Sequence, residues 1–303
     1  MRLAIFSATV AISLTAPAAA QPIALATVGM IADPAQRIAG PCVEVQSLIG
    51  PGLDPHLYQA RPSDIRRLRN ADRIIALGLS LEGRLADILA RVGAVILGDA
   101  IAPQHLLTHG GDAPDPHLWM DPALWATTFP ALAETLTELA PACADDIANR
   151  LIAEVARAEA LNEWARASLA TIPQEQRILL TAHDAFTYFS RAFALENAAI
   201  QGISTTSEPS IADIDQTAQL AVDRAIPAAF IETTLNPRAV QALIEAARAR
   251  GHTLEIGGSL YSDALGELGS GAETWPGMIV SNVRTITEAL GGTVAPLPDQ
   301  ILP

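Results

Sequence analysis

The chain has 303 residues, half of them hydrophobic, so it can bury two apolar cores. Its formal net charge is −14 at pH 7. This acidic balance argues against nucleic acid and anionic membrane surfaces as partners, and it weakly favours cations.

Residues 1–20 have the pattern of a secretory signal peptide. Arg2 precedes an apolar stretch through Leu14, and a small-residue cleavage site ends at Ala20. The apolar stretch is too short to span a bilayer, and no cysteine follows the cleavage site to carry a lipid anchor. We therefore expect a periplasmic protein that begins near Gln21, is not inserted in the membrane and is a monomer.

Residues 21–143 alternate β-type runs with helical periodicity, which predicts a first α/β lobe with a parallel sheet. The predicted strands are Ile23–Val28, Val43–Ile49, Arg73–Leu77 and Ala94–Leu97. The predicted helices are Pro62–Asn70, Leu81–Arg91 and one helix from Pro122 to about Leu139, capped by Asp121. Several glycines and prolines between Gly98 and Pro116 predict a long irregular loop.

A long stretch, Asp145 to Leu169, contains neither glycine nor proline and carries one apolar stripe. It exceeds the usual length of a globular helix, so we assign residues 144–171 to a helix that joins two lobes. A peripheral helix of either lobe fits the pattern equally well.

Residues 172–303 repeat the alternation and predict a second α/β lobe with parallel strands. The predicted strands are Arg177–Thr181, Ala199–Gln201, Ala228–Glu232 and Thr253–Ile256. The predicted helices are Phe186–Ala194, Ile211–Arg224, Pro237–Arg250 and Thr274–Ala289.

The tripeptide Asp-Pro-His occurs twice, ending at His56 and at His117. Proline stiffens each turn, so the Asp two residues upstream, Asp54 or Asp115, can orient an imidazole and leave its other nitrogen free for a metal. The alternative is a pair of ordinary polar turns, because Asp-Pro commonly opens a turn.

Four candidate metal ligands follow predicted strands. His56 and His117 follow strands of the first lobe, and His183 and Asp263 follow strands of the second. Ligands of parallel sheets bind beyond the carboxyl ends of strands, so a cleft between the lobes can bring the four together. Three imidazoles and one carboxylate suit a borderline divalent metal. The alternative for the second pair is helix capping.

Six segments, in order, are similar to the metal-receptor branch of solute-binding proteins that serve zinc and manganese ABC importers. They are Gly52–Tyr58, Ala71–Asp72 with Leu77–Glu82, Asp115–Pro122, His183–Phe189, Gly202–Ser210 and Leu260–Gly266. The resemblance spans the chain after the signal. It implies two α/β lobes joined by one long helix, little hinge motion, metal at His56, His117, His183 and Asp263, and delivery to a membrane permease. Glu208 is a further candidate to accept a hydrogen bond from a ligand histidine.

The choice of metal rests on two departures from that family. Zinc-dedicated members often carry a long His-rich loop, whereas the loop here holds only His105 and His109, which are either exposed or auxiliary ligands. Manganese-specific members usually have Glu where this chain has His183. Imidazole suits Zn²⁺, and carboxylates and water suit Mn²⁺, so we favour zinc with manganese as the alternative.

A zinc-dependent hydrolase is the rival from another class of protein, because three histidines plus a water form a catalytic arrangement. Asp263 would fill the open position, and the chain lacks His-Glu-x-x-His and Gly-x-Ser-x-Gly. We therefore expect a binding protein and no enzymatic activity.

The chain has two cysteines, Cys42 and Cys143. Cys42 begins the strand that leads to His56, and the helix from Pro122 runs away from His117 and ends near Cys143. Both cysteines thus fall at the end of the first lobe that is remote from the cleft, which predicts a disulfide in an oxidising compartment. Two buried free thiols are the alternative.

Overall fold

The structure is a computed structural model that describes residues 20–109 and 113–302. The predicted signal peptide, residues 1–20, lies outside this part of the chain apart from its last residue. Among the described residues, no helix combines the length and the apolar character needed to cross a membrane.

The first lobe contains a parallel sheet with the strand order β2-β1-β3-β4. Its strands are β1 (Ile23–Ala26), β2 (Glu44–Ser47), β3 (Arg73–Ala76) and β4 (Val95–Ile96). In the register, Ala24 pairs with Val45 on one side and Arg73 on the other. The predicted strands are confirmed, and each is shorter than predicted.

The helices of the first lobe include one that the sequence analysis did not assign. They are α1 (Gly29–Ala39), α2 (Pro62–Asn70), α3 (Ala86–Val92), α4 (Pro122–Ala126) and α5 (Phe129–Leu139). Helix α1 contains Pro34, a residue that usually ends a helix because it lacks an N–H donor. Pro34 is buried on the same face as Met30 and Ile38, so tertiary packing maintains the helix across it.

The prediction of one continuous helix from Pro122 to Leu139 is wrong. The chain forms α4 and α5, with a break at Thr127 and Thr128. The hydroxyls of these residues donate to the carbonyls of Leu124 and Trp125, at 2.6 and 2.7 Å, and such bonds compete with helical ones. The predicted cap is confirmed, because the Asp121 carboxylate accepts the Leu124 N–H at 3.1 Å.

The predicted irregular loop between Gly98 and Pro116 contains some regular structure. It holds 3₁₀ turns at Leu97–Ala100 and Pro103–His105 and a short antiparallel pair, β5 (Thr108–His109) with β6 (Ala113–Pro114).

The second lobe is built from two parallel strand pairs, β7 with β8 and β9 with β10. The strands are β7 (Ile178–His183), β8 (Glu196–Gln201), β9 (Ala228–Glu232) and β10 (Glu255–Leu260), and β7 lies beside β9. The helices are α7 (Thr187–Phe193), α8 (Ile211–Asp223), α9 (Arg238–Ala249) and α10 (Trp275–Ala289).

Strand β10 continues four residues beyond the predicted end at Ile256. Two glycines follow Ile256, and glycine in a sequence usually indicates a turn. Here the register shifts between Ile256 and Gly258, as in a β-bulge. A Cβ at Gly257 would lie only 2.7 Å from the Phe230 ring, so the glycine allows this close approach. The longer strand delivers the chain to Asp263.

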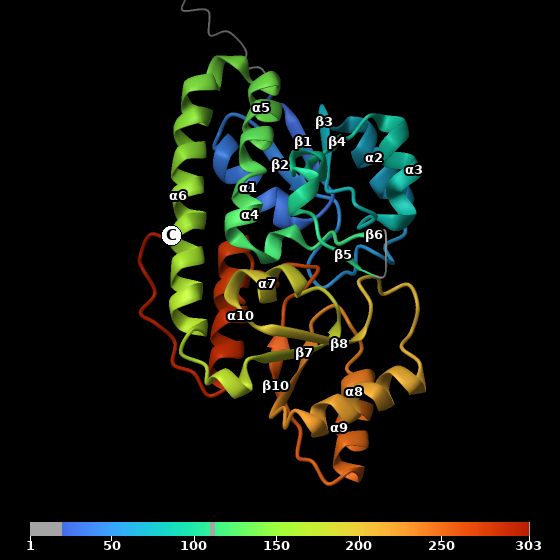
Figure 1. Ribbon diagram of the computed structural model, residues 1–303. Coiled ribbons are helices and arrows are strands. Elements are labelled where there is room, and N and C mark those ends of the chain that lie inside the picture. The colour runs from blue at the N-terminus through green and yellow to red at the C-terminus, as the bar shows by residue number, and fades with distance from the viewer. Residues whose placement is uncertain (1–19, 110–112, 303) are drawn as a thin grey trace, which may run out of the picture.

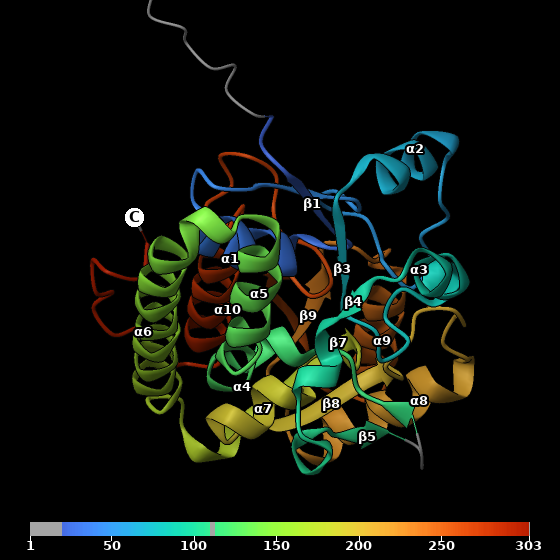
Figure 2. The same cartoon turned by 90° about the horizontal axis from the view of Figure 1, so that it is seen from above.

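Helix α6 (Ala144–Leu169) has 26 residues and runs along both lobes (Figure 1). It packs against α1, α4 and α5 of the first lobe and against α7 and α10 of the second. Seen from above, α1, α5 and α10 gather near α6 on one side of the strands, with α2 and α3 on the other (Figure 2). The predicted α/β fold with one long joining helix is confirmed, whereas the limits 21–143, 144–171 and 172–303 stay a prediction.

The buried apolar residues form two clusters of unequal extent. The larger cluster runs from the first sheet through α6, α7 and α10, and it includes Trp119, Phe129 and Trp275. The smaller cluster lies between the strands of the second lobe and helices α8 and α9. The larger cluster therefore continues from one lobe into the other, and a hinge motion between the lobes would disrupt its packed contacts.

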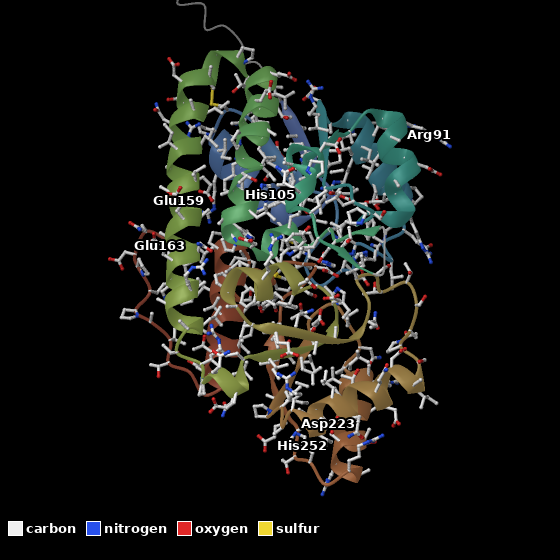
Figure 3. The ribbon with its side chains drawn as sticks, in the orientation of Figure 1. Arg91, His105, Glu159, Glu163, Asp223 and His252 are labelled. Carbon is white, nitrogen blue, oxygen red and sulfur yellow. A yellow bond between two sulfur atoms is a disulfide. The ribbon has the colours of Figure 1, made fainter. Side chains whose placement is uncertain are left out.

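A disulfide joins Cys42 to Cys143, with the two Cα atoms 6.3 Å apart. It ties the entry of β2 to the start of α6, at the end of the first lobe remote from the second lobe (Figure 3). The predicted pairing is confirmed.

Candidate metal centre

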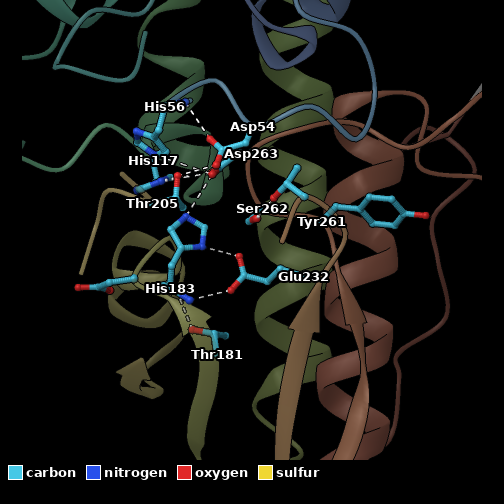
Figure 4. Close-up of polar contacts among 12 residues, drawn as sticks. Asp54, His56, His117, Thr181, His183, Thr205, Glu232, Tyr261, Ser262 and Asp263 are labelled. Carbon is cyan, nitrogen blue, oxygen red and sulfur yellow. Dashed lines mark hydrogen bonds and ion pairs between the residues drawn. The ribbon is translucent and has the colours of Figure 1, made fainter. Parts of the chain in front are cut away.

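The four predicted ligands converge between the two lobes (Figure 4). One ligand atom from each of His56, His117, His183 and Asp263 lies within 4.8 Å of the others, and all four residues are buried. His56 and His117 lie in loops of the first lobe, His183 ends β7, and Asp263 follows β10. The carboxyl ends of the strands therefore meet, as the sequence analysis expected.

The Asp263 carboxylate lies at the centre of this group. Its Oδ2 is 3.1 Å from Nε2 of His183 and 3.8 Å from Nε2 of His56, and its Oδ1 is 3.2 Å from Nε2 of His117. These three nitrogens and both carboxylate oxygens are buried and have no hydrogen-bond partner among the described residues. Buried polar atoms rarely lack a partner, and this donor set fits a divalent metal ion.

Two further carboxylates hold the rings of His117 and His183. Asp115 Oδ1 lies 2.7 Å from Nδ1 of His117 and also accepts that residue's main-chain N–H at 2.9 Å. Glu232 Oε2 lies 2.6 Å from Nδ1 of His183, and its Oε1 accepts the His183 N–H at 2.9 Å. An ionised carboxylate only accepts, so it favours a proton on Nδ1 and leaves Nε2 free for a metal.

The buried carboxylates of the site attract positive charge. Burial favours the neutral form of His117, but Asp115 and then Asp263 outweigh it and raise the pKa of this imidazole to about 9. Burial opposes charge on His183 too, yet Glu232 and Asp263 hold its pKa well above the ordinary value. Burial alone would raise the pKa of the Asp263 carboxyl, but His183 and His117 hold it well below its usual range. Protons or a divalent ion can supply the positive charge that these carboxylates need.

His56 is held differently from the other two histidines. The Asp54 carboxylate was expected to orient an imidazole, but its Oδ1 accepts the main-chain N–H of His56 at 2.8 Å instead of contacting the ring. Burial lowers the pKa of the His56 ring, against the attraction of Asp263. No carboxylate comparable to Asp115 or Glu232 contacts Nδ1 of His56 within the described chain.

Glu232 is the functional residue that the sequence analysis missed. It was placed correctly as the last residue of a predicted strand, beyond the apolar run Ala228–Ile231. A carboxylate at that position faces the edge where ligands gather, and this signal could have identified it. Glu208, which was proposed for such a role, is exposed and lines a cleft together with Asp54. Within the described residues it makes no hydrogen bond to a ligand histidine.

His105 does not belong to the group of four. His105 is exposed (Figure 3), and its carbonyl accepts a hydrogen bond from Arg191 at 3.2 Å. The side chain of His109 lies outside the described part of the chain.

This fold and this site define the class of protein. Residues 25–289 match the family model ZnuA, described as the periplasmic component A of a zinc-uptake complex. The match covers most of the chain, which therefore belongs to this family of metal-binding, solute-binding proteins of ABC importers. Its members are extracytoplasmic binding proteins and not enzymes, so the hydrolase alternative is excluded.

Among individual proteins, the chain is 38% identical over 282 residues to the zinc-binding protein TroA of Treponema pallidum, covering 92% of each chain. It is 37% identical to the manganese-binding lipoprotein MntA of Bacillus subtilis over 270 residues, covering 88% of each. The solved structure of TroA superposes with a TM-score of 0.87 at 38% identity, covering 89% of this chain and 99% of that one. The solved structure of Fe(III)-bound YtgA from Chlamydia trachomatis superposes with a TM-score of 0.84 at 29% identity, covering 91% of this chain and 100% of that one.

These relatives define the general role and leave the metal open. The chain is the substrate-binding component of a metal ABC transporter, with a site for a divalent metal built from three histidines and one aspartate. The zinc-binding and manganese-binding relatives are almost equally similar to it, at 38% and 37% identity.

Proposed function

We propose that this protein is a zinc receptor. It captures Zn²⁺ with His56, His117, His183 and Asp263 in the groove between the lobes and delivers the ion to the permease of an ABC importer. One observation carries the proposal: the ring nitrogens and carboxylate oxygens that face one another are buried and have no hydrogen-bond partner in the part of the chain that the structure describes. A cation bound to all four residues would give each of these buried atoms a partner.

The donor set favours zinc over manganese. Three imidazoles and one carboxylate match the preference of Zn²⁺, and the general affinity order of divalent ions also ranks Zn²⁺ above Mn²⁺. Manganese is the alternative cargo, because a manganese-binding relative is 37% identical and transport does not always follow affinity.

The proposed compartment is the periplasm, reached with residues 1–20 as a cleaved signal and Gln21 as the approximate start. The disulfide between Cys42 and Cys143 supports an oxidising compartment. The working form is a monomer whose lobes, residues 21–143 and 172–303, hold the metal between them. Residues 144–171 connect the lobes.

Metal titration of the purified protein tests the proposal. The protein is stripped with a chelator, and its dissociation constants for Zn²⁺ and Mn²⁺ are measured by competition with a chromophoric chelator. We expect tighter binding of Zn²⁺, with a stoichiometry of one ion per chain. Asp263→Ala and His183→Ala should each weaken zinc binding by more than about a hundredfold, because loss of a ligand exceeds the loss caused by an outer partner.

His105→Ala is the matched control, because its side chain is exposed and does not belong to the group of four ligands. It should bind zinc as the unaltered protein does. Unchanged zinc affinity of Asp263→Ala would refute the proposed site, and tighter binding of Mn²⁺ than Zn²⁺ would reverse the choice of metal. Delivery is tested with the cognate permease and ATPase in vesicles, where the zinc-loaded protein should stimulate ATP hydrolysis more than the stripped protein.

A further inference from the structure

On one side of the metal centre, several hydrogen bonds join the two lobes. The Trp119 indole N–H donates to the Ser262 carbonyl at 2.9 Å, and the Trp275 indole N–H donates to the Trp119 carbonyl at 2.9 Å. The Tyr188 hydroxyl accepts from the Leu107 N–H at 2.9 Å and lies 3.1 Å from the Asp115 carbonyl. These bonds hold the segments that carry His117 and Asp263.

A cleft lies beside another part of the centre. A cleft of about 360 Å³ separates the His56 segment from the loop that follows β8. Its lining includes Leu57 and Ala182, which neighbour His56 and His183 in the sequence. Within the described residues, one hydrogen bond crosses this cleft, from the loop after β8 to the His56 segment. The Thr205 hydroxyl donates to Asp54 Oδ2 at 2.5 Å (Figure 4).

Thr205 differs from its neighbours in the loop. Its side chain is 8% exposed, whereas Ser204, Thr206 and Ser207 are all exposed. The Ser204 and Thr206 hydroxyls bond to each other, within the loop. Thr205 is therefore the residue of this loop that reaches across to the first lobe.

The contact continues to a candidate metal ligand. Thr205 bonds one oxygen of the Asp54 carboxylate, and the other oxygen accepts the main-chain N–H of His56. His56 also has the longest separation from Asp263, at 3.8 Å, and its ring lacks the orienting carboxylate that His117 and His183 possess. The hydrogen bonds from Thr205 through Asp54 therefore hold the main chain of His56 and not its ring.

We propose that Thr205 is a positioning residue that holds the His56 segment closed over the bound metal and thereby sets the rate at which the ion leaves. The inference rests on the proposed function, since it takes His56 to be a ligand. When the bond from Thr205 to Asp54 breaks, the cleft widens on the side of His56, and this ligand can detach while His117 and His183 remain held by their carboxylates.

The test compares dissociation rates of Zn²⁺ from the full, zinc-loaded protein. Excess chelator captures the released ion, and a stopped-flow trace gives the rate constant. Thr205→Val keeps the shape of the side chain and removes the hydroxyl, so release should accelerate about tenfold or more, as expected for a lost hydrogen bond to a charged group. Thr205→Ser keeps the hydroxyl and should release zinc at nearly the original rate.

Thr206→Val is the matched control, because Thr206 is exposed and bonds only within the loop. It should leave the rate unchanged. In an Asp54→Ala background, Thr205→Val should add no further acceleration, since its partner is absent. The melting temperature of the metal-free protein should fall by only a few degrees in Thr205→Val, as for one lost hydrogen bond, and its far-UV circular dichroism spectrum should not change, which separates positioning from a general loss of structure.

Several results would overturn the inference. They are a Thr205→Val rate within twofold of the original, an equal acceleration in Thr206→Val, or an undiminished effect of Thr205→Val in the Asp54→Ala background. The first would point to exit on the other side, past Leu265 and Gly29, where a second cleft reaches Asp263. Failure of the unaltered protein to bind zinc refutes the proposed function instead, so the two failures are distinguishable.

Discussion

The two apolar clusters of this molecule differ in what they hold together. The larger one merges the first lobe with α6, α7 and α10, whereas the smaller one serves only the strands of the second lobe and helices α8 and α9. Both deliver residues to the metal centre: His117 precedes a turn packed in the larger cluster, and His183 and Glu232 end strands beside the smaller one. The metal centre is thus held by two apolar clusters of unequal extent, and substitutions can destabilise each cluster separately.

Trp275→Ala should have the largest effect on the larger cluster. Trp275 is fully buried, its ring meets Phe129 edge-on with centroids 5.9 Å apart, and its indole N–H holds Trp119. Truncation should lower the free energy of unfolding by about 4 kcal/mol, as measured by urea denaturation. Because the cluster continues between the lobes, both lobes should unfold in one transition. Fluorescence and far-UV circular dichroism should therefore give the same midpoint in urea. Separate transitions for the two lobes would contradict a shared core.

Removal of the disulfide should weaken the first lobe without touching the site. The pair Cys42→Ala and Cys143→Ala opens a covalent loop spanning 101 residues, which should reduce the free energy of unfolding by about 3 kcal/mol. The bond lies at the end of the lobe remote from the ligands (Figure 3), so zinc affinity at 25 °C should stay within about twofold. A large loss of zinc affinity would show that this end of the lobe is coupled to the metal centre.

Glu232→Gln and Asp115→Asn compare the carboxylates that the two lobes supply. Each carboxylate contacts both the ring and the main-chain N–H of one histidine. Each variant should weaken zinc binding about 10- to 100-fold, as measured by chelator competition. Glu208→Gln should have no effect, because Glu208 is exposed and makes no such contact in the described part of the chain. If only Asp115→Asn weakens binding, the two lobes do not contribute equally.

Ser210→Ala should have the smallest effect, confined to the smaller cluster. Ser210 caps α8 by accepting the Asp213 N–H, and the Asp213 carboxylate bonds back to the Ser210 N–H. Loss of this capping box should cost about 1 kcal/mol. Hydrogen exchange should accelerate in the first turn of α8 but not in α6. Ser207→Ala, an exposed change in the same loop, is the control.

Much of the site was predictable because chemistry and topology pointed to the same place. Repeated Asp-Pro-His and the strand ends identified His56 and His117, and the same rule identified His183 and Asp263. Asp115 was found for the same reason as His117, since the turn brings its carboxylate back to the ring. Glu232 stands at a strand end, which was a usable signal, but its contact with His183 depends on β9 lying beside β7, and local sequence does not encode that pairing.

The errors in the fold have local physical causes. The sequence analysis missed α1 because this helix contains Pro34, a residue that usually ends a helix. In the folded protein, packing of the buried face of α1 outweighs the hydrogen bond that proline cannot donate. The hydroxyls of Thr127 and Thr128 divided a helix that hydrophobic periodicity predicts as continuous. Gly257 indicated the end of a strand, although it serves close packing against Phe230.

Helix α10 has a consequence for how the chain matures. It follows the first lobe along the chain by more than a hundred residues, yet its residues Trp275, Met278 and Val283 belong to the larger apolar cluster, which includes the core of the first lobe. A chain still emerging on the far side of a membrane, with this segment not yet through, leaves that cluster incomplete and its apolar surface uncovered. The apolar cluster of the first lobe is therefore completed only when α10 has arrived.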